Sequence, residues 1–319
     1  MKVAVLGATG ETGSSIINGL LESSRPRYDI TALTRPSSLE SPKILSMKKR
    51  GIRVVAADIT SPENQLVQLV AGMDVVISAI APFHHDAEIP LINASKIAGV
   101  KRYVPCFFGP VAPPKGILTL RDMKEDVLNH IKKVFLPFTV IDIGWWYQLA
   151  LPRLPSGRID DALLMPMENI AGEGNVPSAL THLDDIGKYV SRIVADPRTL
   201  NQMVFAYNEL HTQNQVFDML ERISGEKIKR KHRSRQDIEA AVSELSASEA
   251  GSSEAHMLQY QQYLISWGIR GDNTPDYARY LGYLDSKQLY PEFEGKTLEF
   301  HCQETLNGSA RKLYADRVA

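Results

Sequence analysis

A glycine-rich turn between a predicted strand and a predicted helix constrains this chain more than any other feature. Residues 2–6 form a short apolar run, Gly7-Ala-Thr-Gly10-Glu-Thr-Gly13 follows directly, and apolar residues then recur at helical spacing. Glycines in such a turn let the backbone approach a pyrophosphate, whose charge meets the free amides at the positive end of the helix. The alternative is a structural turn without a ligand. The order strand, turn, helix favours a dinucleotide site that uses Gly7, Thr9, Gly10, Glu11, Thr12 and Gly13.

Short β-rich runs alternate with amphipathic stretches over the first half of the chain. We expect strands at residues 2–6, 29–34, 53–57, 75–79, 102–105 and 138–142. Helices are expected between them, at residues 12–22, 41–50, 62–70, 86–98 and 120–133. Strands that alternate with helices build a parallel sheet through right-handed crossovers. The pattern predicts an α/β fold with a Rossmann-like, doubly wound parallel sheet.

The alternation weakens after Leu154, where prolines and glycines become frequent. Such a stretch suits loops over a substrate site better than a packed core. Helices are expected again at residues 184–195 and 214–224, with a pair of exposed helices within residues 237–256. We predict a dinucleotide-binding domain at residues 1–154 and a smaller C-terminal α/β substrate lobe at residues 155–319, interleaved with the first domain. The active cleft is expected between them, at the carboxyl ends of the strands.

Composition limits the class of partner. Of 319 residues, 44% are hydrophobic and 23% are charged, which excludes a disordered chain. The net charge of −1 gives no excess of positive charge that would favour binding to nucleic acid or to an anionic membrane. The basic run at residues 227–233 lacks interleaved aromatics, which favours a solvated loop. No signal-peptide hydrophobic region opens the chain, and two cysteines imply no disulfide framework. We expect a cytoplasmic monomer or homodimer that binds a small molecule, with no nucleic-acid or membrane partner.

The residues that follow the predicted second strand indicate which of NAD and NADP the chain prefers. Arg35 lies 35 − 13 = 22 positions after Gly13, where an acidic residue would bind the ribose 2′-hydroxyl of NAD. A cation there, with Ser37 and Lys43 nearby, suits a 2′-phosphate and favours NADP; the alternative is a solvated loop arginine. Other strand-end residues expected to contact the cofactor are Asp58 near the adenine and Ala79, Ile80 and Ala81 near the ribose and pyrophosphate.

A conventional short-chain dehydrogenase carries a Tyr-x-x-x-Lys pair on the helix after its fifth strand. The one match that we consider, Tyr283 with Lys287, lies near the C-terminus, far outside the predicted nucleotide domain. No tyrosine lies four positions before Lys124 or Lys132. If the protein is a catalyst of this kind, a lysine must therefore act without its tyrosine.

Several short motifs in a fixed order resemble one family. They are the glycine turn, Asp74-Val-Val-Ile-Ser78, Gly99-Val-Lys-Arg-Tyr103, Pro105-Cys-Phe-Phe-Gly109, Leu136-Pro-Phe-Thr139, Asp184-Asp-Ile-Gly187, Asp196-Pro-Arg-Thr-Leu-Asn201, Gly271-Asp272 and Leu289-Tyr-Pro291. Together they resemble the isoflavone reductase-like family. That family contains phenylcoumaran benzylic ether, pinoresinol-lariciresinol and isoflavone reductases, and it belongs to the NmrA-like, atypical short-chain dehydrogenases. The resemblance covers nearly the whole chain.

The resemblance implies roles for specific residues. A helix lysine is the proposed catalytic group of the family, and it corresponds to Lys124, which lies 137 − 124 = 13 positions before Pro137. Partial burial would lower the pKa of such a lysine and let it exchange a proton. Phe108 is expected to pack on the nicotinamide. Residues expected to line the substrate pocket are Phe83, His84, His85, Trp145, Trp146 and Tyr147.

The chain departs from the family after its fifth strand. Cys106 and Phe107 replace a serine and a glutamate there, so polar support beside the nicotinamide is lost. A lone thiol is more often a core residue than a nucleophile. The histidine pair suits acid–base chemistry, contact with a substrate oxygen or a solvent-facing loop. No third ligand stands at a useful spacing from it, so no metal site is predicted.

These features predict an NADPH-dependent reductase. Hydride would pass to an electron-poor carbon of a phenolic or polyketide-like secondary metabolite, such as a conjugated alkene, a quinone methide or a benzylic ether. Lys124 would supply a proton or stabilise the developing negative charge. Two alternatives stay open: an NmrA-type redox sensor that binds NADP(H) without turnover, and a redox-neutral isomerase or dehydratase on the same scaffold.

Overall fold

The computed structural model describes residues 1–80, 85–248 and 251–314. The chain forms two compact units. Unit 1 contains Met1–Phe108, Asp122–Ile141 and Asp184–Val204, and unit 2 contains Gly109–Arg121, Asp142–Leu183 and Phe205–Ala319. Each unit draws on several separate stretches of chain. The expected division of the chain at residues 154 and 155 stays a prediction.

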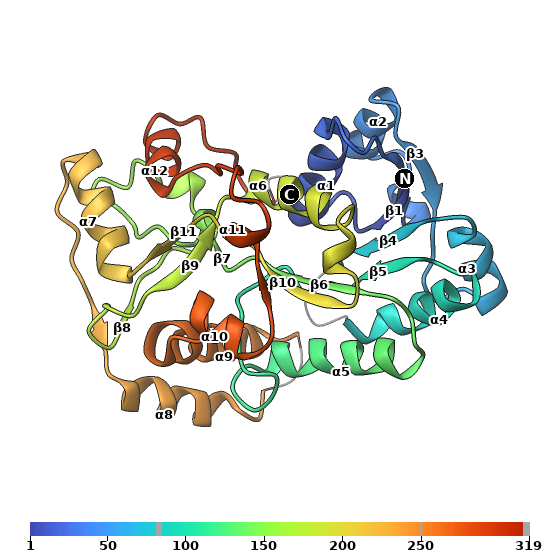
Figure 1. Ribbon diagram of the computed structural model, residues 1–319. Coiled ribbons are helices and arrows are strands. Elements are labelled where there is room, and N and C mark those ends of the chain that lie inside the picture. The colour runs from blue at the N-terminus through green and yellow to red at the C-terminus, as the bar shows by residue number, and fades with distance from the viewer. Residues whose placement is uncertain (81–84, 249–250, 315–319) are drawn as a thin grey trace. The chain divides into compact units, whose positions relative to one another are not determined.

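A five-stranded parallel sheet with the order β3-β2-β1-β4-β5 forms the centre of unit 1 (Figure 1). A parallel bridge between Tyr103 and Phe138 connects β5 to the segment that leads into β6, and β6 pairs with β10. The strands of this region are β1 (Lys2–Leu6), β2 (Asp29–Thr34), β3 (Arg53–Ala56), β4 (Val75–Ser78), β5 (Arg102–Val104), β6 (Thr139–Asp142) and β10 (Gln202–Phe205). All four residues of β4 are buried, as expected of a strand covered on both faces.

Helices connect these strands. They are α1 (Glu11–Glu22), α2 (Pro42–Lys49), α3 (Glu63–Val70), α4 (Ile89–Ile97), α5 (Thr119–Lys133) and α6 (Leu183–Ile193). The buried side of α1 carries Ile16, Ile17 and Leu20, each no more than 1% exposed. Helix α4 begins later than the expected residue 86, because a 3-10 turn, His85–Glu88, precedes it and Pro90 occupies its first turn.

Two glycines let α1 and α6 pack backbone against backbone. A Cβ atom on Gly19 would lie 2.0 Å from the carbonyl carbon of Gly187, and one on Gly187 would lie 1.8 Å from the carbonyl oxygen of Ser15. The amide of Gly187 also donates a hydrogen bond to Ser15 Oγ at 3.0 Å. Neither helix has room for a side chain at this crossing.

Replacing Gly187 with alanine should therefore destabilise unit 1. Overpacking a tight contact costs about 1–3 kcal/mol, and more where the backbone itself must move. Urea unfolding followed by far-ultraviolet circular dichroism measures the loss. Leu21→Ala, at an exposed position of α1, is the control and should change little. An unchanged unfolding midpoint for the Gly187 variant would show that the helices separate at no cost.

Unit 2 is built from short strands and helices. One sheet has the order β11-β9-β7, and β8 pairs with β12. The strands are β7 (Trp145–Trp146), β8 (Ile170–Ala171), β9 (Ser178–Thr181), β11 (Glu209–His211), β12 (His232–Arg233) and β13 (Leu284–Asp285). The helices are α7 (Gln213–Ser224), α8 (Arg235–Leu245), α9 (Ser253–Tyr263), α10 (Pro275–Tyr280), α11 (Ser286–Leu289) and α12 (Leu298–Leu306). A π-helical segment, Leu264–Arg270, continues α9.

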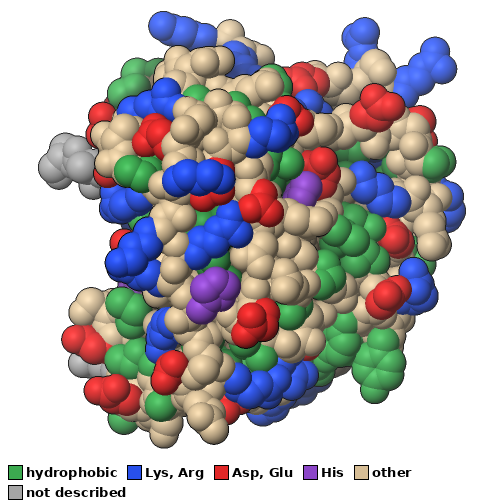
Figure 2. All heavy atoms as spheres, turned by 90° about the vertical axis from the view of Figure 1, so that its left-hand side faces the viewer, with side chains coloured by type: hydrophobic (Ala, Val, Ile, Leu, Met, Phe, Trp, Pro, Cys, Tyr) green, Lys and Arg blue, Asp and Glu red, His purple; other side chains and the backbone are tan. Residues whose placement is uncertain are grey.

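Charges of both signs are interspersed on the face of unit 2 that carries α7 (Figure 2). Within the basic run, Arg230 pairs with Asp218 at 2.5 Å, and Lys227 pairs with Glu221 at 3.1 Å. Acidic side chains of α7 therefore offset part of the charge of this run. Throughout the described ranges, no helix combines the length and the apolar character needed to cross a bilayer.

Candidate functional site

The glycine turn lies between β1 and α1, at the carboxyl end of β1. Gly7 has φ +77°, and a Cβ atom there would lie 2.3 Å from the carbonyl oxygen of Ala79. A Cβ atom on Gly13 would lie 2.1 Å from the carbonyl oxygen of Gly7. The pairing of β1 with β4 brings Ala79 to this turn, where its amide donates to Leu6 at 2.9 Å. Side chains are therefore excluded at Gly7 and Gly13, and Ala79, with Ile80 after it, reaches the same edge of the sheet.

The start of α1 has the features of an anion site. Gly10 is the N-cap residue, and no side chain caps the helix. The amides of the first turn, from Glu11, Thr12 and Gly13, can therefore face a pyrophosphate. Lys43 Nζ from α2 donates to the carbonyl oxygen of Thr9 at 3.4 Å, which adds a cation to the turn. The geometry fits the phosphate groups of a dinucleotide.

Exposed polar residues follow the neighbouring strands at the same sheet edge. Arg35 comes directly after β2 and precedes a 3-10 turn, Pro36–Ser38, that contains the exposed Ser37. Asp58 follows β3 and accepts hydrogen bonds from the amide and hydroxyl of Thr60 at 2.9 and 2.7 Å. Those hydrogen bonds lower the pKa of the Asp58 carboxyl group. Parallel pairing of β1, β2 and β3 thus places Arg35 and Asp58 along the edge that carries the glycine turn.

Phe108, the residue expected at the nicotinamide, has a strained backbone. Its φ is +23°, which a residue with a side chain seldom adopts, and its amide donates to the carbonyl oxygen of Ile141 at 2.9 Å. The residue is 6% exposed. Strain of this kind persists where the surrounding structure over-determines it, often at functional sites.

Lys124 is held inside unit 1 by the same loop. Its ammonium group donates a hydrogen bond to the carbonyl oxygen of Phe107, and the residue is 9% exposed. The Nζ atom also lies 5.9 Å from the centre of the Phe107 ring. These contacts fix the cation beside the peptide that leads into Phe108, so the structure brings together the two residues predicted for the nicotinamide side.

A buried carboxylate that the sequence analysis missed lies next to this loop. Glu88 is 1% exposed, accepts a hydrogen bond from Tyr103 Oη at 3.1 Å and accepts another from the amide of Cys106 at 3.4 Å. A carboxylate from the start of α4 thus contacts the loop in which Cys106 and Phe107 lie. No sequence signal marked it, because Glu88 reaches the loop only through the pairing of β4 with β5.

Cys106 is a protonated thiol at neutral pH. Burial, and then the Glu88 carboxylate, raise its pKa to about 12. Its Sγ atom lies 3.4 Å from the carbonyl oxygen of Ile80 and donates to it. Burial likewise raises the pKa of the Cys302 thiol to about 12.

Both cysteines of the folded protein should therefore resist alkylation. Only the thiolate reacts, and at pH 8 a thiol with a pKa near 12 is about 10³-fold poorer in thiolate than a free cysteine. Mass spectrometry after iodoacetamide should show unmodified native protein and two modifications after denaturation. Rapid alkylation of native Cys106 would contradict the raised pKa.

The residues expected at the substrate lie in unit 2, in the turn before α4 or outside the described residues. Trp145 is 7% exposed and contacts Tyr263 and Trp267, with ring centres 4.8 and 6.1 Å away, while Trp146 is half-buried. Tyr147 is fully buried, and its hydroxyl donates to Glu209 Oε2 at 2.7 Å. Ala81, Phe83 and His84 lie outside the described residues, and His85 is described only by its backbone, in the turn before α4.

Known proteins are similar to this chain in sequence. The NmrA-like family matches residues 1–275. An asnovolin J 5′,6′-dehydrogenase of Aspergillus novofumigatus is 46% identical over 314 residues, which cover 97% of this chain and 96% of that protein. Pinoresinol reductase 1 of Arabidopsis thaliana is 30% identical over 319 residues, which cover 93% of this chain and 95% of that protein. The predicted resemblance is confirmed.

Solved structures share the fold. A binary complex of leucoanthocyanidin reductase with NADPH, from Vitis vinifera, matches with a TM-score of 0.80 over 96% of this chain and 100% of that chain, at 23% identity. Together with the parallel sheet of unit 1, this match confirms the predicted α/β fold class.

Proposed function

The chain belongs to the NmrA-like family, among its isoflavone reductase-like members, and on that premise we propose that it is an NADPH-dependent oxidoreductase of secondary metabolism. It transfers hydride between the nicotinamide and a carbon atom of a phenolic or polyketide-like substrate. One observation carries the proposal: the buried Lys124 ammonium is fixed beside the strained Phe108 on the sheet edge that also carries the glycine turn.

The names of relatives indicate the class of bond. The relative that is 46% identical is named a 5′,6′-dehydrogenase, whereas the relative that is 30% identical is named a reductase. Dehydrogenation of two adjacent carbons and reduction of a conjugated alkene are the same transfer of one hydride and one proton run in opposite directions. The proposed substrate is thus an oxygenated ring system with a conjugated alkene, a quinone methide or a benzylic ether.

Each group at the site has a role in this chemistry. The amides at the start of α1 would bind the pyrophosphate, and Arg35 with Lys43 would bind the 2′-phosphate. Phe108 would lie against the nicotinamide, which would supply or accept the hydride. The Phe107 carbonyl holds the Lys124 ammonium group, which would stabilise negative charge on the substrate oxygen or donate a proton to it.

Substrate turnover tests the proposal. Purified protein is incubated with NADPH and a panel of phenolic enones, quinones and benzylic ethers, and with NADP⁺ and the saturated analogues. The proposal expects nucleotide oxidation or reduction coupled to product in at least one pair. Tight NADPH binding without turnover would instead support the redox sensor. Product formed while the nucleotide keeps its oxidation state would support an isomerase or dehydratase.

Replacing Arg35 with serine should lower the affinity for NADPH but not for NADH. A hydrogen bond to a charged group contributes about 1.5–3 kcal/mol, so the dissociation constant of NADPH should rise about 10- to 100-fold. Fluorescence titration with each nucleotide gives the two constants. Lys49→Ser, at the exposed end of α2, is the control. If the variant loses affinity for NADPH and NADH equally, Arg35 does not recognise the 2′-phosphate.

A further inference from the structure

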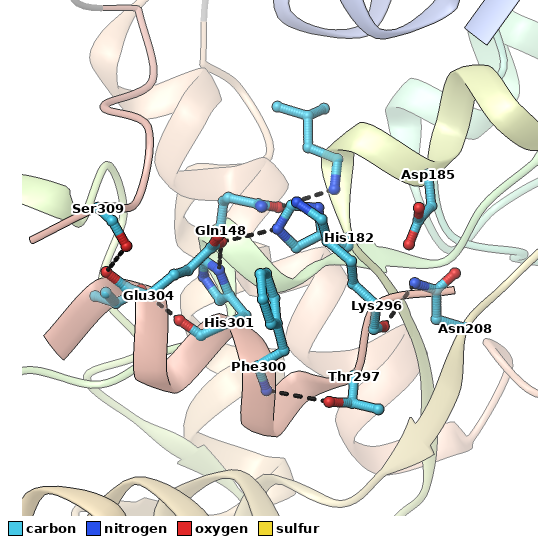
Figure 3. Close-up of polar contacts among 12 residues, drawn as sticks. Gln148, His182, Asp185, Asn208, Lys296, Thr297, Phe300, His301, Glu304 and Ser309 are labelled. Atoms are coloured by element: carbon cyan, nitrogen blue, oxygen red, sulfur yellow. Dashed lines mark hydrogen bonds and ion pairs between the residues drawn. The ribbon is translucent and has the colours of Figure 1, made fainter. Parts of the chain in front are cut away.

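Two histidines and a glutamate of unit 2 converge at a place remote in sequence from the predicted site residues. His182 lies between β9 and α6, and His301 and Glu304 lie on α12 (Figure 3). One possible ligand atom from each residue lies within 4.8 Å of the others. Sequence spacing could not predict the group, because one histidine comes from a distant segment while the other two residues are neighbours on one helix face.

The three side chains form a compact hydrogen-bonded group. His182 Nε2 lies 2.9 Å from Glu304 Oε1, and His301 Nδ1 lies 2.8 Å from the same oxygen. The side chains of His182 and His301 are 3% and 4% exposed, and that of Glu304 is 16% exposed. Both imidazoles thus point a nitrogen at one carboxylate oxygen inside the unit, and the carboxylate side is the one nearest to water.

Glu304 gives this group a negative charge. Its carboxylate is largely shielded from water, and both imidazoles lie against one of its oxygens. A cation bound among the three side chains would offset that charge.

The surroundings hold both rings in place. The Tyr147 ring stacks on His301 with centres 6.1 Å apart and meets His182 edge-on at the same distance. On either side of His182 the chain is anchored, since Thr181 Oγ1 donates to the carbonyl of Ile143 and the amide of Leu183 donates to Gln148 Oε1. Preorganised ligands of this kind lose little entropy when an ion binds.

We propose that His182, His301 and Glu304 form a binding site for a divalent transition-metal ion, most suitably Zn²⁺. Two imidazole nitrogens and one carboxylate oxygen are ligands that Zn²⁺ accepts, with a water molecule in the fourth position. Ligand atoms 2.8–4.8 Å apart need only side-chain adjustment to surround an ion at bonds of about 2.0–2.2 Å. The N–H proton that now faces Glu304 moves to the other ring nitrogen or leaves to solvent as each bond to the ion forms. Such an ion ties α12 to the turn that precedes α6.

Cobalt titration tests the site without any nucleotide or substrate. Tetrahedral Co²⁺ bound to nitrogen and oxygen ligands absorbs visible light, and Zn²⁺ should displace it. Wild-type protein should bind one equivalent and lose the absorption when Zn²⁺ is added. Glu304→Gln keeps an oxygen that accepts both imidazole hydrogen bonds, so it should fold normally yet bind Co²⁺ at least about 100-fold more weakly. His182→Gln and His301→Gln should do the same.

The control variant is His256→Gln, because His256 is an exposed histidine on α9. It should bind Co²⁺ as the wild type does. Tryptophan fluorescence checks that every variant is folded, since all three tryptophans belong to unit 2. Absence of the Co²⁺ spectrum in wild-type protein would overturn the proposal and leave a hydrogen-bonded group without an ion. A spectrum that persists in Glu304→Gln and both histidine variants would place the ion elsewhere.

Discussion

Turnover is expected to fall by about 10²- to 10⁴-fold when Lys124 is replaced by methionine, which is the range that a general acid or base contributes. Methionine is unbranched and of similar length, but it carries neither a proton nor a charge. The lysine it replaces is 9% exposed and bonded to the Phe107 carbonyl, so its position is fixed by the protein. The loss corresponds to about 2.7–5.5 kcal/mol in the activation free energy.

The kinetic constants separate this role from a purely structural one. If Lys124 acts on charge that develops in the transition state, kcat falls while the dissociation constant of NADPH changes by no more than about tenfold. Lys133→Met, at an exposed position in the last turn of α5, is the matched control and should keep full activity. If the Lys124 variant shows only a raised KM, or keeps more than a tenth of the wild-type kcat, then Lys124 does not act in the chemical step.

The regular part of unit 1 could be predicted from local sequence. The strands at residues 2–6 and 29–34 have the predicted bounds, because each is a short apolar run with a clear stop: a glycine turn in one case and Arg35-Pro36 in the other. Helix α5 starts one residue earlier than expected. The local sequence pattern is sufficient to place these elements, because buried parallel strands need mostly apolar runs and because capping residues mark the ends of helices.

Contacts between distant segments could not be predicted in this way. The close approach of Gly19 to Gly187 depends on how α1 and α6 cross, and a single glycine inside a helix pattern gives no hint of its partner. Glu88 is an acidic residue at a predicted helix start, and nothing in the local sequence indicates that its side chain contacts the amide of Cys106. The same limit applies to His182 and His301, whose proximity arises only from tertiary packing.

The aromatic contacts of Trp145 are a further feature that local sequence could not predict. The family resemblance implies that Trp145 lines the substrate pocket, and that role stays a prediction. The structure adds partners that no local pattern indicated: Tyr263 and Trp267 come from the end of α9 and its π-helical continuation. Departures from regular helix of this kind are frequent at functional sites, but their sequences carry no reliable signal.

Arg121 holds together a buried polar network that contributes to the stability of unit 2. It precedes Lys124 by one turn of α5 and is 3% exposed, and its guanidinium donates to Asp142 Oδ2 and to Tyr283 Oη, both at 2.6 Å. Tyr283 Oη in turn donates to Asp142 Oδ2 at 2.6 Å. Tyr283 is the tyrosine of the C-terminal Tyr-x-x-x-Lys match, and this network accounts for its position without a catalytic role.

Replacing Arg121 with methionine should lower the free energy of unfolding of unit 2 by about 3–5 kcal/mol, because it leaves the fully buried Asp142 carboxylate without its cation. Tyr283→Phe should cost less, about 1–3 kcal/mol, since the arginine still offsets the charge. The double variant Arg121→Met with Asp142→Asn should recover part of the first loss, because no buried charge is left alone. Urea unfolding followed by tryptophan fluorescence reports on unit 2, where all three tryptophans lie. If the double variant is no more stable than Arg121→Met, the cost lies in packing around the arginine side chain and not in the stranded carboxylate.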